Sequence, residues 1–291
     1  MFLDSALVWA MRYQASRSSR FVYGTVYSRL WAIGRSLIHC GFLLDAAALA
    51  KMPPEPVLQI FLRSGPEVFL PELRLRGPAP VSAEAKREIL RALPAEGEVK
   101  VLSAPQRNKV ASLSRIFDLH DRASVYVVKV VEVPQAILAL HARCVLLISE
   151  PGLAIWSAEE FQALAAHEIG HEYVWEKYYD ARAGNRLKEL QQLELYCDGI
   201  SIMTLTAAGL DPSNLTSAVK KGICYNRAHL GVARNESSYP DFGRRASFHK
   251  ALIQWIAEYR AEYQRALDRG QSVIPARNRL HRLARLSYVA H

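Results

Sequence analysis

Most of the chain carries apolar residues at helical spacing. Aromatic and aliphatic residues lie between arginines over residues 1–70, a pattern that predicts a helical region. The Pro- and Gly-rich stretch 71–80 that follows predicts a connecting segment. Further helices are predicted at 82–93, 186–203 and 251–267, and also after Ser157, where Ser157-Ala-Glu-Glu160 forms a capping box.

A strand pattern covers one part of the chain. Residues 124–133 are rich in β-branched side chains, and residues 137–149 form a second apolar run, with Pro134-Gln135 interrupting the pairing between them. No apolar stretch reaches the ~18–20 residues that a membrane-spanning helix needs. The residues Met1-Phe2-Leu3-Asp4 lack the basic region of a signal peptide. We expect a mostly helical α+β fold with a small sheet, in a cytoplasmic protein or a peripheral membrane protein.

The charge of the chain is unevenly distributed. Lys and Arg number 37 against 28 Asp and Glu, which gives a net charge of +9, and half of the 291 residues are hydrophobic, which argues against disorder. Residues 244–291 hold ten Lys or Arg against three acids. Arg-rich termini of this kind favour an acidic partner or an anionic membrane surface, and we expect no specific nucleic acid. Four widely spaced cysteines without a Cys-x-x-Cys pair argue against a structural zinc knuckle and against a disulfide framework.

The helix predicted after Ser157 contains His167-Glu168-Ile169-Gly170-His171. The two histidines are one turn apart on one helix face, so both imidazoles can reach one metal ion. Glu168 lies beside the first histidine and can reach a water on that metal, which suits a general base. Apolar flanking residues make unpaired polar side chains costly here, and a metal ion would satisfy them. The motif therefore predicts a site for one Zn²⁺.

A third ligand is expected from a later helix. One class of zinc peptidase would need Gly and His three and six residues after His171, where this chain has Val174 and Lys177. A second class takes a glutamate instead, and Glu194 lies on the apolar stripe of the helix predicted at 186–203.

Asp198 follows Glu194 by one helical turn, on the same stripe. Two carboxylates on a core-facing stripe repel each other unless a cation and a donor hold them. We expect Glu194 as the third ligand and Asp198 as the acceptor that orients His167. The alternative is that both carboxylates belong to a solvated helix face.

Five segments of the chain resemble, taken together, the conserved segments of a known enzyme family. They are Leu147-Ile-Ser-Glu-Pro-Gly-Leu153, Ala166-His-Glu-Ile-Gly-His171, Glu194-Leu-Tyr-Cys-Asp198, Ala208-Gly-Leu-Asp-Pro212 and Ser238-Tyr-Pro-Asp-Phe-Gly-Arg-Arg245. In this order they resemble the HtpX and CAAX-prenyl-endopeptidase family of gluzincin zinc metallopeptidases, over roughly residues 80 to 255. The resemblance implies a gluzincin core with a small edge sheet and flanking helices. The domains expected from it are an N-terminal helical region (1–70), a peptidase domain (71–243) and a basic helical region (244–291) packing on the core.

The resemblance also implies an activity. The chain would be a zinc metalloendopeptidase acting on a protein or peptide, which would add as an extended strand to the sheet edge near residues 136–141. The family usually has His before the Pro of the last segment, and this chain has Tyr239. Tyr239 and Arg245, the latter at the family's Arg position, are expected to assist at the reacting carbonyl, with His229 and Arg244 as further candidates.

Two alternatives remain open from the sequence. One is a zinc-binding scaffold without activity, and the other is a basic module that binds nucleic acid or a membrane surface. His229 and His249 are expected to be ordinary helix or loop histidines, since no spacing ties them to the motif. Cys197 is expected to be a small core residue, and Trp175, Tyr178 and Tyr179 are expected mainly to pack.

Overall fold

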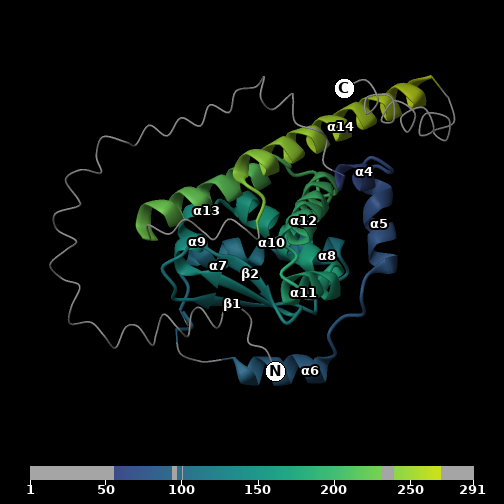
Figure 1. Cartoon of the computed structure of the whole chain (residues 1–291). Coiled ribbons are helices and arrows are strands. Elements are labelled where there is room, and N and C mark those ends of the chain that lie inside the picture. Colours follow the sequence, from purple (N-terminus) through teal and green to yellow (C-terminus); the bar gives the residue numbers. More distant parts are fainter. Residues whose placement is uncertain (1–55, 94–96, 100, 231–238, 270–291) are drawn as a thin grey trace, which may run out of the picture. The chain divides into compact units, whose positions relative to one another are not determined.

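The computed structural model describes residues 56–93, 97–99, 101–230 and 239–269 (Figure 1). All of them belong to the second of two units into which the chain divides, Pro53–His291. The helices expected before residue 56 and the basic tail after residue 269 lie outside the described residues. None of the helices within these ranges is long and apolar enough to cross a membrane.

A three-stranded sheet lies in the first half of the described chain (Figure 1). Its strands are β1 (Val127–Val131), β2 (Leu138–His141) and β3 (Val145–Ser149). The order is β1-β3-β2, with β3 parallel to β1 and antiparallel to β2. Every residue of β3 is buried, as expected for the central strand of an apolar sheet. Strand β2 therefore forms one edge of the sheet.

Helices make up most of the remaining described chain. Those before the sheet are α4 (Leu58–Phe61), α5 (Pro66–Arg76), α6 (Ala83–Ala92), α7 (Ala104–Ala111) and α8 (Ser114–Leu119). Those after it are α9 (Glu150–Ile155), α10 (Ala158–Tyr173), α11 (Trp175–Ala183), α12 (Leu187–Ala207), α13 (Asn214–Leu230) and α14 (Phe242–Asp268). The mostly helical α+β class with a small sheet is thus confirmed.

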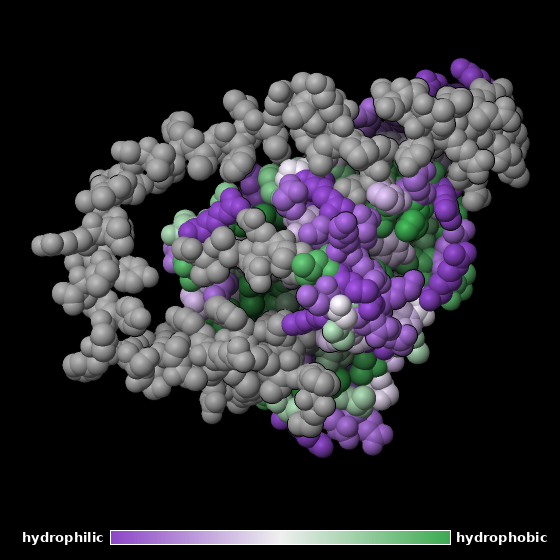
Figure 2. Space-filling view, in the orientation of Figure 1, coloured by the Kyte–Doolittle hydropathy of each residue, from purple (hydrophilic) through white to green (hydrophobic). Residues whose placement is uncertain are grey.

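The core lies around α10 and α12, which pack closely against each other. Phe161 and Ile169 of α10 and Leu195 and Ile200 of α12 are fully buried. Among the described residues, the large apolar side chains that stay exposed are scattered along the chain: Ile60, Leu75, Val101, Tyr263 and Leu267. On the face shown in Figure 2, hydrophilic residues accordingly separate smaller hydrophobic patches.

Helix caps appear where the sequence predicts them. The Ser82 side chain accepts a hydrogen bond from Ala85 N at the start of α6. At the start of α10, Ser157 and Glu160 form the complete capping box. Lys221 and Ser217 of α13 also bind the Glu160 carboxylate, which ties this end of α10 to α13.

Two expectations need correction. Residues 71–76 are not a connection, because α5 continues through Pro71 to Arg76, so an expected domain boundary at residue 71 falls inside a helix. Burial of Phe69, Leu70 and Leu73, on an element that packs against α12, outweighs the interruption at Pro71. The apolar run 137–149 is also not one strand but the hairpin of β2 and β3.

Candidate metal centre

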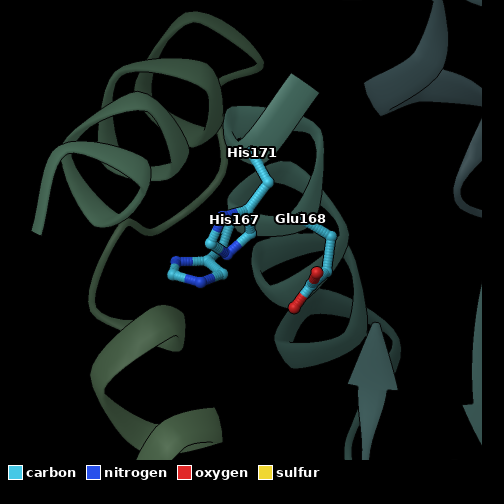
Figure 3. Close-up of side chains that lie close together, drawn as sticks. All are labelled: His167, Glu168 and His171. Atoms are coloured by element: carbon cyan, nitrogen blue, oxygen red, sulfur yellow. The ribbon is translucent and has the colours of Figure 1, made fainter. Parts of the chain in front are cut away.

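Helix α10 presents the two motif histidines side by side. The ring centroids of His167 and His171 lie 5.0 Å apart, and Figure 3 shows both imidazoles extending from one helix face with the Glu168 carboxylate beside them. One ligand atom from each of these residues lies within 4.8 Å of the others. His167 is buried, whereas Glu168 and His171 are partly exposed. These three side chains could together hold a metal ion. A metal site at the motif was expected, but with Glu194 and not Glu168 as the third ligand.

Gly170 brings a second helix close to this face. A Cβ atom at this position would lie only 2.9 Å from the Cα of Cys197 on α12. Any larger residue would therefore push α10 and α12 apart. The close approach places the buried side chains of Glu194 and Asp198 next to the histidines.

Glu194 contacts both histidines. Its Oε2 lies 3.4 Å from His167 Nε2, and its Oε1 lies 3.8 Å from His171 Nε2. Tyr178 of α11 donates a hydrogen bond to Oε1 at 3.1 Å. Burial favours the neutral acid, but His171 and His167 outweigh burial and lower the pKa of Glu194 to about 2. The group is therefore a carboxylate at neutral pH.

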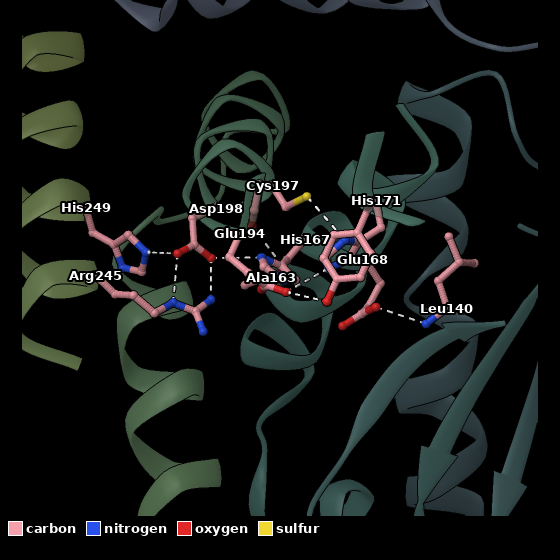
Figure 4. Close-up of polar contacts among 12 residues, drawn as sticks. Leu140, Ala163, His167, Glu168, His171, Glu194, Cys197, Asp198, Arg245 and His249 are labelled. Carbon is pink, nitrogen blue, oxygen red and sulfur yellow. Dashed lines mark hydrogen bonds and ion pairs between the residues drawn. The ribbon is translucent and has the colours of Figure 1, made fainter. Parts of the chain in front are cut away.

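Asp198 connects the site to α14. Its Oδ1 lies 2.8 Å from His167 Nδ1, the contact expected for an acceptor that orients this ring. Arg245 donates to both carboxylate oxygens, through Nε at 2.8 Å and through Nη2, and His249 Nε2 lies 3.0 Å from Oδ2 (Figure 4). All these side chains are buried. Burial opposes ionisation, yet Arg245 and His249 hold the pKa of Asp198 well below its usual range.

The electrostatics of the centre favour a cation. Burial alone would lower the pKa of His167, but the hydrogen bonds that its ring donates to the Asp198 and Glu194 carboxylates raise it from 6.5 to about 9. Without a metal the pair of carboxylates thus holds an additional proton on the ring between them. A metal ion would replace that proton on Nε2 and supply the positive charge itself.

A buried oxygen atom of Glu194 gives a further test of that fit. Within the described part of the chain, Glu194 Oε2 makes no well-aligned hydrogen bond, and it faces His167 Nε2 at 3.4 Å. Such an atom is costly unless something binds it. A tetrahedral ion with ligands at about 2.1 Å separates its ligand atoms by about 3.4 Å. The separation of Glu194 Oε2 from His167 Nε2 is 3.4 Å, so this pair of ligand atoms has the spacing that a zinc ion requires, and Glu194 Oε1 lies 3.8 Å from His171 Nε2.

The Glu168 carboxylate faces the sheet and not α12, the helix that carries Glu194. Its Oε2 accepts a hydrogen bond of 2.9 Å from Leu140 N on the edge strand β2 (Figure 4). The backbone of β2 thereby fixes the carboxylate beside the two histidines. Glu168 thus lies beside the two histidines and contacts the edge strand β2.

Other residues differ from expectation. Arg245 is buried and pairs with Asp198, so the contacts in the structure assign it to holding that carboxylate, and its expected part at a reacting carbonyl stays a prediction. His249 is part of the same network, contrary to expectation, and only its i, i+4 spacing from Arg245 on α14 would have indicated this. Tyr178 contacts Glu194 instead of only packing.

The remaining candidates lie in different surroundings. Burial and then the Glu194 carboxylate raise the pKa of Tyr178, and against the effect of burial Asp198 raises the pKa of Arg245. Tyr239 makes a smaller contribution to both shifts, which places it near the centre. His229 is exposed on α13 and its ring stacks on Tyr225. Arg244 donates to Gln191 at 2.7 Å. Tyr239 thus has an electrostatic tie to residues that contact the metal-site carboxylates.

Cys197 contacts the second motif histidine. Its Sγ lies 3.5 Å from His171 Nδ1. Burial, followed by the charges of Glu194 and Asp198, raises the pKa of the thiol well above 9.0, so it stays neutral. With Nε2 directed to a metal, Nδ1–H would donate to this sulfur and fix the ring orientation.

Cys197→Ala is expected to weaken zinc binding by about 10–100-fold, the usual effect of losing a partner of a ligating histidine. Cys197→Ser, which keeps an acceptor, should recover most of the affinity. Competition with a chromogenic chelator measures both, with Cys144→Ala, another buried cysteine, as the control. Unchanged affinity in Cys197→Ala would limit this cysteine to packing.

Comparison with models of known families and with curated proteins finds no match to this chain. The resemblance to gluzincin peptidases therefore depends on the motif residues themselves. The geometry around His167, Glu168, His171, Glu194 and Asp198 stands beside it as independent support for a metal centre.

Proposed function

We propose that the chain is a zinc-dependent metalloendopeptidase of the HtpX-like gluzincin type. One observation carries the proposal: a buried, ionised Glu194 lies against both motif histidines, while Glu168 of the same motif is held at the edge strand. The first glutamate thus suits a metal ligand, and the second suits a general base. This division of roles is what peptide hydrolysis at a zinc centre requires.

His167, His171 and Glu194 would hold the ion. Zinc bound there would supply Lewis-acid chemistry, polarising a peptide carbonyl and acidifying water. Asp198 holds His167 through Nδ1, which would leave Nε2 free to bind the ion. Arg245 and His249 in turn fix Asp198 from α14.

Glu168 would carry the proton transfer. Its carboxylate would accept a proton from the attacking water and later pass it to the leaving amine. The hydrogen bond from Leu140 N would keep this side chain in place during both transfers. Tyr239 is the candidate donor to the developing oxyanion, since it lies near Tyr178 and Arg245. An extended peptide would pair with β2, next to Glu168.

The basic binding module is less well supported. Arginines of α14 already have partners within the described chain: Arg245 with Asp198, Arg260 with Glu67, and Arg265 with Glu262. A helix face of paired arginines offers less charge to an anionic surface than its sequence suggests. An inactive zinc scaffold remains the rival that an activity measurement must exclude.

Metal removal tests the proposed function. The purified chain with one equivalent of zinc is expected to cleave an unfolded protein, to stop after treatment with a chelator, and to resume when zinc is added back. Product formation by mass spectrometry is the measurement, and the chelator-treated protein given Mg²⁺, which prefers oxygen ligands, is the control. Zinc binding without any cleavage would support the scaffold.

A further inference from the structure

Along β2, residues whose peptide groups bond to β3 alternate with residues whose peptide groups face away from the sheet. Ser149 N donates to Ile137 O, and Cys144 N donates to His141 O, so odd-numbered residues here bond to β3 or its ends. In an antiparallel pair the intervening residues then point their N–H and C=O groups away from the partner strand. Ala136, Leu138 and Leu140 are therefore the residues that face the open edge.

Two side chains occupy the ends of this edge. Glu168 accepts from Leu140 N at the end near the metal centre. At the other end, Asn226 of α13 binds both peptide groups of Ala136: Ala136 N donates to Oδ1 at 2.8 Å, and Nδ2 donates to Ala136 O at 3.1 Å. The carboxamide thus makes the two hydrogen bonds that a residue of an added strand would make.

Leu138 lies between these ends. No residue in the described part of the chain bonds its N–H or C=O from outside the sheet. A peptide added to β2 would make its pair of hydrogen bonds here. The next pair would fall two residues further, about 6.6 Å along the strand, at Ala136. There the peptide would meet the Asn226 side chain instead of open backbone.

We propose that Asn226 closes one end of the β2 edge, so that the peptide is held by backbone pairing for only a short run on that side of the scissile bond. This rests on the proposed function, because it assigns the edge to the substrate of that site. Asn226 is then a specificity-determining residue. Peptide residues that extend past Leu138 of β2 toward Ala136 add no backbone hydrogen bonds to the strand. Strand pairing is independent of side chains, so this limit would apply to any extended sequence.

The test measures how affinity depends on peptide length. Zinc-loaded, full-length Glu168→Gln protein, which would bind without cleaving, is titrated with fluorescent Thr-Val peptides from roughly two to roughly eight residues long, extended at either end. With Asn226 present, affinity is expected to rise and then level off in one of the two series. In the Glu168→Gln, Asn226→Ala double variant, affinity in the same series should keep rising over two more peptide residues. The rise should be about tenfold in total and come from new hydrogen bonds at Ala136.

Asn226→Asp separates this role from a purely structural one. The aspartate still accepts from Ala136 N, so it keeps one tie between α13 and β2, but it cannot donate to Ala136 O. A partial gain with long peptides is expected for it. Equal length dependence with and without Asn226, or no peptide binding at all, would overturn the inference.

The outcome is distinguishable from that of the proposed function. Cleavage of unfolded protein by the wild type, together with equal length dependence in all variants, would remove the role of Asn226 and leave the peptidase in place. If the wild type did not cleave, but affinity for Asn226→Ala kept rising with peptide length, the assignment of the edge to a peptide would be supported and the peptidase activity would be ruled out.

Discussion

Glu168→Gln is expected to lower the rate of peptide cleavage by about 10²–10⁴-fold, the usual contribution of a general base. The amide cannot accept a proton from water, so the attacking nucleophile is no longer formed at this position. The replacement is otherwise conservative, since the amide oxygen can still accept from Leu140 N, as the carboxylate oxygen does. We therefore expect the fold and the zinc content to be unchanged.

Initial rates on an unfolded protein substrate, measured at equal zinc content, give the result. Glu176→Gln is the matched control, because Glu176 is exposed on the neighbouring helix α11 and contributes nothing to the proposed mechanism. It should cleave like the wild type. If Glu168→Gln also kept the wild-type rate, Glu168 would not be the base, and the proposed mechanism would be wrong.

Asp198→Ala is expected to destabilise the zinc-free protein by about 3–5 kcal/mol, the cost of breaking a buried ion pair. Arg245 and Asp198 are 6% and 0% exposed, and removing the carboxylate leaves the guanidinium buried without its partner. His167 and His249 lose a contact with the same group. The loss therefore spreads over α10, α12 and α14.

Urea unfolding of both zinc-free proteins measures this difference. Glu67→Ala, which removes the exposed partner of Arg260, is the control, and a surface pair of this kind should cost only about 0–1 kcal/mol. Equal midpoints for Asp198→Ala and the control would show that the network does not hold the three helices together.

Helices α6, α10 and α12 could be predicted, because local signals determine them, whereas part of α5 falls in an expected connection and α13 was not predicted. Ser157 starts α10 through a capping box that is complete in four residues. The β2–β3 hairpin was not predicted, because its turn uses Ala142 and Arg143 at φ of 47° and 60° instead of the Asn or Gly that usually mark such turns. Only the pairing of the flanking strands reveals why these residues adopt that conformation.

The candidate site was predictable to the extent that helical spacing determines it. His167, His171, Glu194 and Asp198 follow from i, i+4 periodicity on two helices. Asn226 and His249 do not, because their partners are brought together only by the packing of α13 and α14. The interhelical contact at Gly170, which brings α12 to the histidines, is likewise a property of the packed structure.

Zinc content of three proteins tests the central claim, the division of roles between the two glutamates. Native mass spectrometry in the presence of a competing chelator would compare the wild type, Glu168→Gln and Glu194→Gln. Zinc-finger peptides bind Zn²⁺ through four ligands with a binding free energy of about 10–16 kcal/mol. Losing one ligand should therefore lower the affinity for zinc by about 10²–10³-fold. We predict one zinc in the wild type and in Glu168→Gln, and none in Glu194→Gln. Zinc lost from Glu168→Gln and kept by Glu194→Gln would contradict the account.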